Sequence, residues 1–187
     1  LTISTDHHGF VTVGDLDGDL DIDVIASDGP EIRVFVNDGA QDPTFGVQAI
    51  YTASSNIRSI TTGDYDDDGD LDFVATWSSN LQLFENTSTN EIEFQPHLID
   101  DLADCGINCL VSGDFDSDNA IDLAAGTTAG AVVLYENLSI TPFEFAPLLI
   151  NSADGQQRDV QFMLAMDIDR DGRLDILSAH EGGDAVR

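Results

Sequence analysis

Short apolar segments separated by polar turns recur along the chain in groups of four, and the groups repeat about every fifty residues. Alternating or short apolar segments of this length are typical of β-strands. The last group contains two such segments followed by a glycine-rich stretch. The predicted strands are residues 10–13, 24–26, 32–36 and 45–51; 57–62, 73–76, 81–84 and 94–99; 109–112, 123–125, 132–135 and 143–150; and 160–165 and 176–178.

Four short strands in each repeat predict an all-β fold. The pattern is typical of a β-propeller, here of about four blades with four antiparallel strands each, because the apolar faces of a blade need neighbouring blades to cover them. Residues 1–5 match the end of a repeat and are interpreted as the last strand of a preceding or closing blade. We therefore predict one propeller-type repeat region over residues 1–187, with repeats at 6–54, 55–104 and 105–154 and a partial repeat at 155–187.

An aspartate-rich stretch joins the first two predicted strands of every repeat. The four copies read GDLDGDLDID, GDYDDDGDLD, GDFDSDNAID and MDIDRDGRLD. Counted from the first aspartate, acidic residues occupy positions 1, 3, 5 and 9 of each copy, and such a concentration of carboxylates would be repulsive without a cation among them. These aspartates are Asp15, Asp17, Asp19 and Asp23; Asp64, Asp66, Asp68 and Asp72; Asp114, Asp116, Asp118 and Asp122; and Asp167, Asp169, Asp171 and Asp175.

The ligand chemistry of these loops favours calcium, with up to four ions per chain. Ca²⁺ accepts six to eight oxygens, whereas Mg²⁺ requires a tighter octahedron and Zn²⁺ prefers nitrogen or sulfur. A backbone carbonyl at position 7 would complete the set. The residues at that position are Asp21, Asp70, Ala120 and Arg173.

Two features separate the loops from an EF-hand and from one another. Position 12 lacks the bidentate glutamate of an EF-hand, and the flanking segments are predicted strands in place of helices. Position 6 is Gly69 or Gly172 in two loops, which permits a sharp turn, and Leu20 or Asn119 in the other two. The turns of these two loops are therefore expected to be less ideal; Asn tolerates the left-handed backbone region, whereas Leu does not.

The segments GDLDGDLDIDVI, GDYDDDGDLDFVA and DIDRDGRLDILSA resemble FG-GAP or VCBS-type repeats. These are the calcium-binding blades of integrin α-subunit propellers and of many secreted microbial proteins. The resemblance implies a β-propeller in which the aspartate loop connects the first two strands of each blade. It also implies that the aspartates named above bind calcium and that the protein is extracellular, either secreted or on the cell surface.

The net charge of the chain disfavours two classes of binding partner. The chain has 36 acidic and 6 basic residues, which gives a formal net charge of −30. Nucleic acids and anionic membrane surfaces would repel such a protein. Because no apolar run approaches the roughly 20 residues of a membrane span, membrane insertion is not expected either.

Two further pairs of residues suggest covalent modifications, a disulfide and glycosylation. Cys105 and Cys109 could form a local disulfide in an oxidising compartment, or they could be two buried thiols. Asn86 and Asn137 begin the sequons NTS and NLS at the same point of consecutive repeats. Equivalent exposed turns would suit glycosylation, but such tripeptides also arise by chance.

The functional prediction is a non-enzymatic, extracellular, calcium-dependent module for adhesion or for assembly into a larger particle or filament. Its partner would be another protein or a second copy of the chain, bound through exposed blade or strand edges. A glycan-binding, lectin-like propeller is one alternative. The other is an accessory domain of a secreted carbohydrate-active enzyme or phospholipase, since one fold serves many functions.

Overall fold

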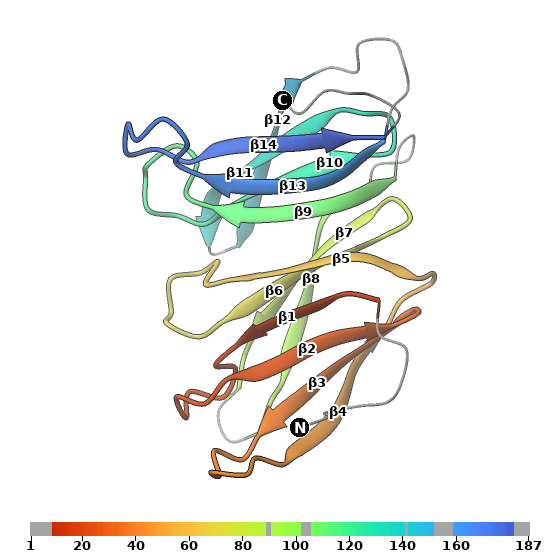
Figure 1. The fold of residues 1–187 in the computed structure, drawn as a ribbon, viewed down its shortest axis with the longest axis vertical. Helices are drawn as coiled ribbons and strands as arrows, with labels where there is room; N and C mark the ends of the chain where they lie inside the picture. Colours follow the sequence, from red (N-terminus) through yellow and green to blue (C-terminus); the bar gives the residue numbers. More distant parts are fainter. Residues whose placement is uncertain (1–8, 89–90, 102–105, 141, 152–158, 182–187) are drawn as a thin grey trace.

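The computed structural model describes residues 9–88, 91–101, 106–140, 142–151 and 159–181. In these residues the chain is all-β and contains 14 strands in four antiparallel sheets (Figure 1). The prediction of an all-β fold is therefore confirmed. No helix in the described part of the chain is long and apolar enough to cross a membrane.

Three sheets contain four strands each, and every sheet follows chain order. The first consists of β1 (Val11–Gly14), β2 (Asp23–Asp28), β3 (Glu31–Asn37) and β4 (Phe45–Thr52). The second consists of β5 (Ile57–Gly63), β6 (Asp72–Trp77), β7 (Asn80–Asn86) and β8 (Phe94–Asp101). The third consists of β9 (Ile107–Gly113), β10 (Asp122–Thr127), β11 (Val132–Ile140) and β12 (Phe143–Asn151). The fourth pairs β13 (Val160–Met166) with β14 (Asp175–His180).

All fourteen strands predicted within the repeats are present, with ends shifted by a few residues. The largest extension is in β11, which continues to Ile140, beyond the predicted end at residue 135. The strand predicted at residues 1–5 lies outside the described residues. The division of the chain into repeats with the boundaries given above stays a prediction.

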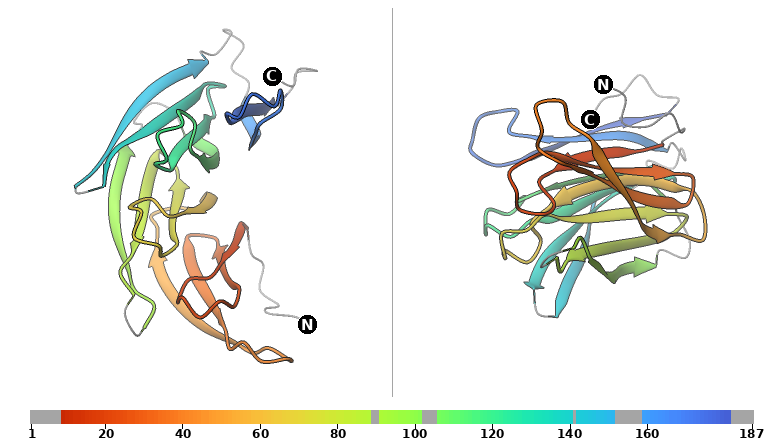
Figure 2. Two further views of the ribbon diagram at one scale, coloured as in Figure 1. Left: turned by 90° about the vertical axis from the view of Figure 1, so that its left-hand side faces the viewer. Right: turned by 90° about the horizontal axis from the view of Figure 1, so that it is seen from below.

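The sheets stack side by side into a curved row (Figures 1 and 2). The first strands, β1, β5, β9 and β13, line the concave side, whereas β4, β8 and β12 lie on the convex side (Figure 2, left). Along the concave side β1 contacts β5, β5 contacts β9, and β9 contacts β13. The described sheets form an open arc, with the first and fourth sheets at opposite ends.

Apolar side chains fill the space between neighbouring sheets. The middle strands β6 and β10 are buried at every position, in keeping with the apolar residues that follow the first aspartate of each strand. Between the first two sheets, the rings of Phe73 and Phe84 stack with centroids 4.5 Å apart. Between the third and fourth sheets, Cys109, Val160 and Met163 are buried together. Each sheet therefore obtains its core from its neighbours, as expected of repeated blades.

Candidate metal centres

The four aspartate loops connect the first two strands of each sheet and project from the same side of the stack (Figure 1). We number them loop 1 (residues 15–23), loop 2 (64–72), loop 3 (114–122) and loop 4 (167–175), and count positions from the first aspartate. The stacking of the sheets places the loops in one row along an edge.

A shared pattern of backbone hydrogen bonds folds each loop. The N–H at position 6 donates to the position-1 carboxylate in all four loops, at 2.9 to 3.1 Å. The N–H at position 7 donates to the position-5 carboxylate, at 2.8 to 2.9 Å. Position 6 has a positive φ in every loop: 74° at Leu20, 96° at Gly69, 75° at Asn119 and 91° at Gly172. Leu20 thus adopts the left-handed conformation that its side chain disfavours.

In loops 1, 2 and 3 the position-9 aspartate connects the loop to the third strand of its own sheet. Asp72 is 1% exposed, and its two oxygens accept N–H groups from Tyr65 (2.9 Å) and Asn86 (2.7 Å). Asp23 and Asp122 are equally buried and are held in the same way, by position 2 of the loop and by an asparagine of the third strand. In these three loops one carboxylate at the start of the second strand therefore joins the beginning of the loop to the third strand.

Each loop gathers three carboxylates whose oxygens lie within 4.8 Å of one another. In loops 2, 3 and 4 the three come from positions 1, 3 and 9, whereas in loop 1 they come from positions 1, 3 and 5. The triads are Asp15, Asp17 and Asp19; Asp64, Asp66 and Asp72; Asp114, Asp116 and Asp122; and Asp167, Asp169 and Asp175. The remaining predicted ligands fall outside these triads and stay predictions. They are Asp23, Asp68, Asp118 and Asp171 and the position-7 residues Asp21, Asp70, Ala120 and Arg173.

Burial makes the carboxylates of loop 2 costly to ionise. It is the main cause that raises the pKa of Asp72 to about 7 and that of Asp66 to about 6, and neighbouring carboxylates add to both effects. One oxygen of Asp66 is buried without a hydrogen-bond partner. The pKa is also raised, chiefly by burial, at Asp17, Asp23 and Asp122. A cation in the triad would offset these costs, and a cluster built from oxygen atoms alone suits a hard metal ion.

The pattern that defines FG-GAP-like repeats matches residues 15–75 and 114–178, which span all four loops. The chain belongs to the FG-GAP-like repeat family. This match confirms the resemblance inferred from the loop sequences. No protein of curated function matches the chain.

The arrangement of this FG-GAP-like protein is similar to that of a known β-propeller. One of twelve matching solved chains comes from the crystal structure of BBS1N in complex with ARL6DN, soaked with lead. The TM-score is 0.55 at 10% sequence identity, over 94% of this chain and 55% of that chain. At such low identity the likeness concerns the fold alone, and the present chain spans about half of the length of the chain it matches.

Asn86 and Asn137 have a structural place in the FG-GAP-like blades that differs from the one predicted. Their side chains belong to residues that are 3% and 4% exposed, and each Nδ2 donates to two backbone carbonyls. The exposed turn on which the glycosylation hypothesis depended is therefore absent at both positions, because a glycan requires an accessible Nδ2. A sequence signal for this role was present: Asn37 occupies the same position in the first repeat without a sequon.

Of the two cysteines, the structure describes Cys109. Its side chain is 8% exposed and lies between the third and fourth sheets, where burial raises the pKa of the thiol to about 11. Cys105 lies outside the described residues, so the disulfide stays a prediction.

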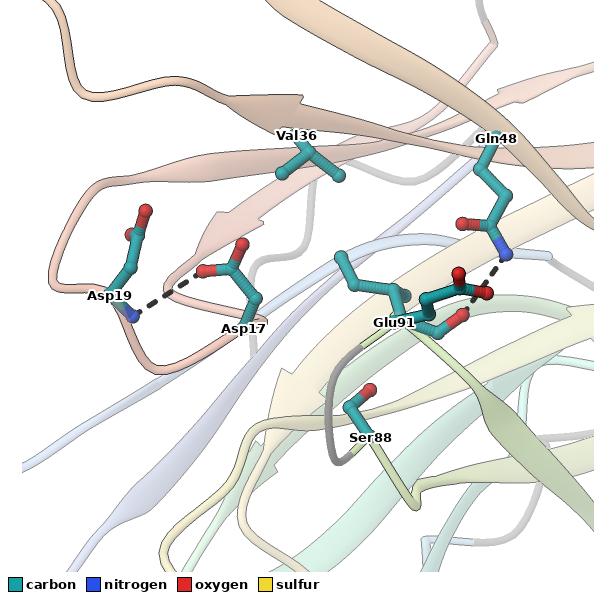
Figure 3. A pocket seen from close by; sticks show the side chains of 7 residues that line it. Asp17, Asp19, Val36, Gln48, Ser88 and Glu91 are labelled. Atoms are coloured by element: carbon teal, nitrogen blue, oxygen red, sulfur yellow. Dashed lines mark hydrogen bonds between the residues drawn. The ribbon is translucent and has the colours of Figure 1, made fainter.

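A pocket of about 380 Å³ opens beside loop 1, between the first two sheets (Figure 3). Asp17 and Asp19 of the loop line one side, and Gln48 lies on the other, where its amide donates to the carbonyl of Ile92 at 3.0 Å. The pocket thus brings two carboxylates of the loop 1 triad next to amide, hydroxyl and apolar groups. Its lining residues are Asp17, Asp19, Val36, Gln48, Ser88, Glu91 and Ile92.

Proposed function

We propose that this chain is a calcium-binding, propeller-type module whose ions hold the blades in shape, and that it serves protein binding, adhesion or assembly outside the cell. The observation that carries the proposal is that a carboxylate triad is present in each of the four loops, always with the aspartates at positions 1 and 3. A single acidic turn is common on protein surfaces. Four such triads in an FG-GAP-like chain favour a shared ligand.

Calcium is the proposed ion because of the donor set and the loop geometry. Each loop offers carboxylate oxygens with no histidine or cysteine, which disfavours zinc. The loops are exposed at positions 4 to 6 and leave room for carbonyl and water oxygens, as the higher coordination number of Ca²⁺ requires. The position-7 carbonyls of Asp21, Asp70, Ala120 and Arg173 are the proposed additional ligands.

The proposed role of the ion is structural and the module is proposed to be non-enzymatic. In loop 2 the Asp72 carboxylate accepts N–H groups from the start of the loop and from the third strand, which suits an ion that fixes the hairpin between two strands. Protein binding is consistent with the neighbour of similar fold, which was crystallised in a complex. A secreted or cell-surface setting is proposed because millimolar calcium would keep such loops filled.

Thermal unfolding of chelator-treated protein, repeated with calcium and with magnesium, tests the proposal. Calcium should raise the melting temperature more than magnesium does. Asp64→Asn should reduce the gain, whereas the matched control Asp42→Asn, an exposed residue outside the loops, should not. Equal melting temperatures with calcium and with chelator would refute the proposed role of the ion. Light scattering in the same two buffers tests assembly, since a calcium-dependent particle should lose mass on chelation.

Glycan binding is the second candidate, and the pocket beside loop 1 favours it. A calcium ion held by Asp17 and Asp19 would face the pocket and could accept sugar hydroxyls, while Gln48 and Ser88 offer further polar contacts. Val36 and Ile92 provide an apolar wall for a sugar ring. A glycan array probed with and without calcium separates this candidate from the first: saturable binding that requires calcium would support it, and no binding would remove it.

A further inference from the structure

Asn86 connects loop 2 with loop 1. Its Nδ2 donates to the carbonyl of Leu16 at 2.9 Å and to that of Leu71 at 3.2 Å. Leu16 lies between the first two aspartates of loop 1, and Leu71 precedes Asp72 in loop 2. The backbone N–H of Asn86 donates to Asp72 at 2.7 Å. One buried residue therefore contacts two candidate metal loops.

Asn137 repeats this arrangement one sheet further along. Its Nδ2 donates to the carbonyl of Tyr65 in loop 2 at 2.8 Å and to that of Ile121 in loop 3 at 3.3 Å. Its backbone N–H donates to Asp122 at 2.9 Å. The same three contacts at consecutive interfaces make up a chain of hydrogen bonds that runs from loop 1 through loop 2 to loop 3.

The backbone carbonyls at position 2 accept these bonds next to two of the loop carboxylates. The N–H of Leu16 donates to Asp23 at 2.9 Å and its carbonyl accepts from Asn86, so the backbone of this residue is held by its own loop on one side and by Asn86 on the other. It joins Asp15 to Asp17, two members of the loop 1 triad. A shift of the Leu16 carbonyl would therefore move both carboxylates, and the bond is buried, where it is stronger than in water.

Asn37 provides the internal comparison. It occupies the same position in the first sheet, and its backbone N–H donates to Asp23 at 2.8 Å. Within the described residues its Nδ2 donates to the carbonyl of Ile22, at 3.2 Å, which lies in its own loop. Asn37 thus shares the contacts that Asn86 makes within a sheet, and the described structure gives it no bond to a second loop.

We propose that Asn86 and Asn137 are positioning residues that couple neighbouring metal loops, so that an ion in one loop increases the affinity of the next. An ion in loop 2 would fix Asp72, Asp72 fixes the backbone of Asn86, and the side chain of Asn86 fixes the Leu16 peptide of loop 1. Such coupling is reciprocal, so loop 1 strengthens loop 2 by the same factor. This inference rests on the proposed function, because it concerns the same calcium loops.

Calcium titration of protein labelled with ¹⁵N-glycine tests the coupling site by site. Gly18 reports on loop 1, Gly69 on loop 2 and Gly172 on loop 4, since each lies within its loop. Asp64→Asn disables loop 2. We expect this change to weaken calcium binding at Gly18 by about fivefold, at the lower end of measured couplings between sites. In the Asn86→Ala background the same change should leave the affinity at Gly18 unaltered, and in the control Asn37→Ala background the fivefold effect should remain.

The outcomes separate this inference from the proposed function. Glycine resonances that do not respond to calcium would refute the proposed function itself. If Gly18 and Gly69 respond but Asp64→Asn leaves the affinity at Gly18 unchanged, the coupling is refuted, and that result needs no substitution at Asn86. If the fivefold effect persists in Asn86→Ala, other contacts transmit it and the assignment to Asn86 is wrong.

Discussion

Replacing Gly126 by alanine should separate the third and fourth sheets. Gly126 lies in β10 with an ordinary φ, and a Cβ atom at this position would lie 2.6 Å from Cγ1 of Val160, 2.8 Å from Cβ of Val160 and 2.7 Å from Sγ of Cys109. Carbon atoms in contact are about 3.5 to 4.0 Å apart. The two sheets would therefore have to move apart by roughly 1 Å, because the Cβ of Val160 is fixed by the backbone of β13.

Overpacking of this kind costs about 1 to 3 kcal/mol. We expect the upper half of that range, since three atoms are too close and two of them belong to a β-branched side chain. Against this, alanine lowers the entropy of the unfolded chain and would stabilise an unhindered site by about 0.5 kcal/mol. The expected net loss in the free energy of unfolding is about 2 kcal/mol, which corresponds to a urea midpoint lower by about 1 M.

Equilibrium unfolding in urea, with saturating calcium, measures this loss. The matched control is Gly46→Ala in β4, because a Cβ there meets no atom within 4 Å and its φ is also ordinary. The control should be neutral or slightly stabilising. Equal midpoints for the two variants would refute the close contact between the third and fourth sheets on which the stacked arrangement depends.

Three further predictions concern the loops. Leu20→Gly should raise the free energy of unfolding, measured in urea, by up to about 1 kcal/mol. Leu20 has a φ of 74° and is 88% exposed, so glycine would relieve backbone strain without loss of packing. A clear destabilisation would contradict the loop geometry. In chelator, the free energy of unfolding should fall as the pH rises from about 4 to about 7. The pKa values of Asp72 (about 7) and Asp66 (about 6) are raised in the folded chain, so it keeps protons that the unfolded chain has lost in this range. Urea unfolding at several pH values measures this, and excess calcium should abolish the fall. Removing calcium should lower the melting temperature in proportion to the number of filled loops, since each site adds about 2.7 kcal/mol at a free calcium concentration one hundred times its Kd; a melt that is independent of calcium would exclude this linkage.

The strands and the loops were predictable from the sequence because both depend on local patterns. The repeating apolar segments predicted the strands and their order, and the spacing of the aspartates identified all four loops. Leu20 shows where local preference is overridden: its side chain disfavours a positive φ, but the hydrogen bond from its N–H to Asp15 keeps the conformation common to the four loops.

The relations between sheets were not predictable in the same way. The sequon at Asn86 predicts an exposed side chain, but this residue is buried because the preceding sheet brings the carbonyl of Leu16 to 2.9 Å from its Nδ2. The composition of each triad also depends on side-chain orientation, so that Asp19 joins the triad of loop 1 whereas Asp72, at position 9, joins that of loop 2. The pocket beside loop 1 likewise requires the packing of two sheets.

The central claim is that each of the four loops binds calcium. Isothermal titration of chelator-stripped protein with calcium, followed by the same titration of Asp64→Asn, tests it most directly. We expect four ions bound per wild-type chain and three per variant chain, with magnesium binding more weakly. No saturable calcium binding, or an unchanged number of ions in the variant, would contradict it.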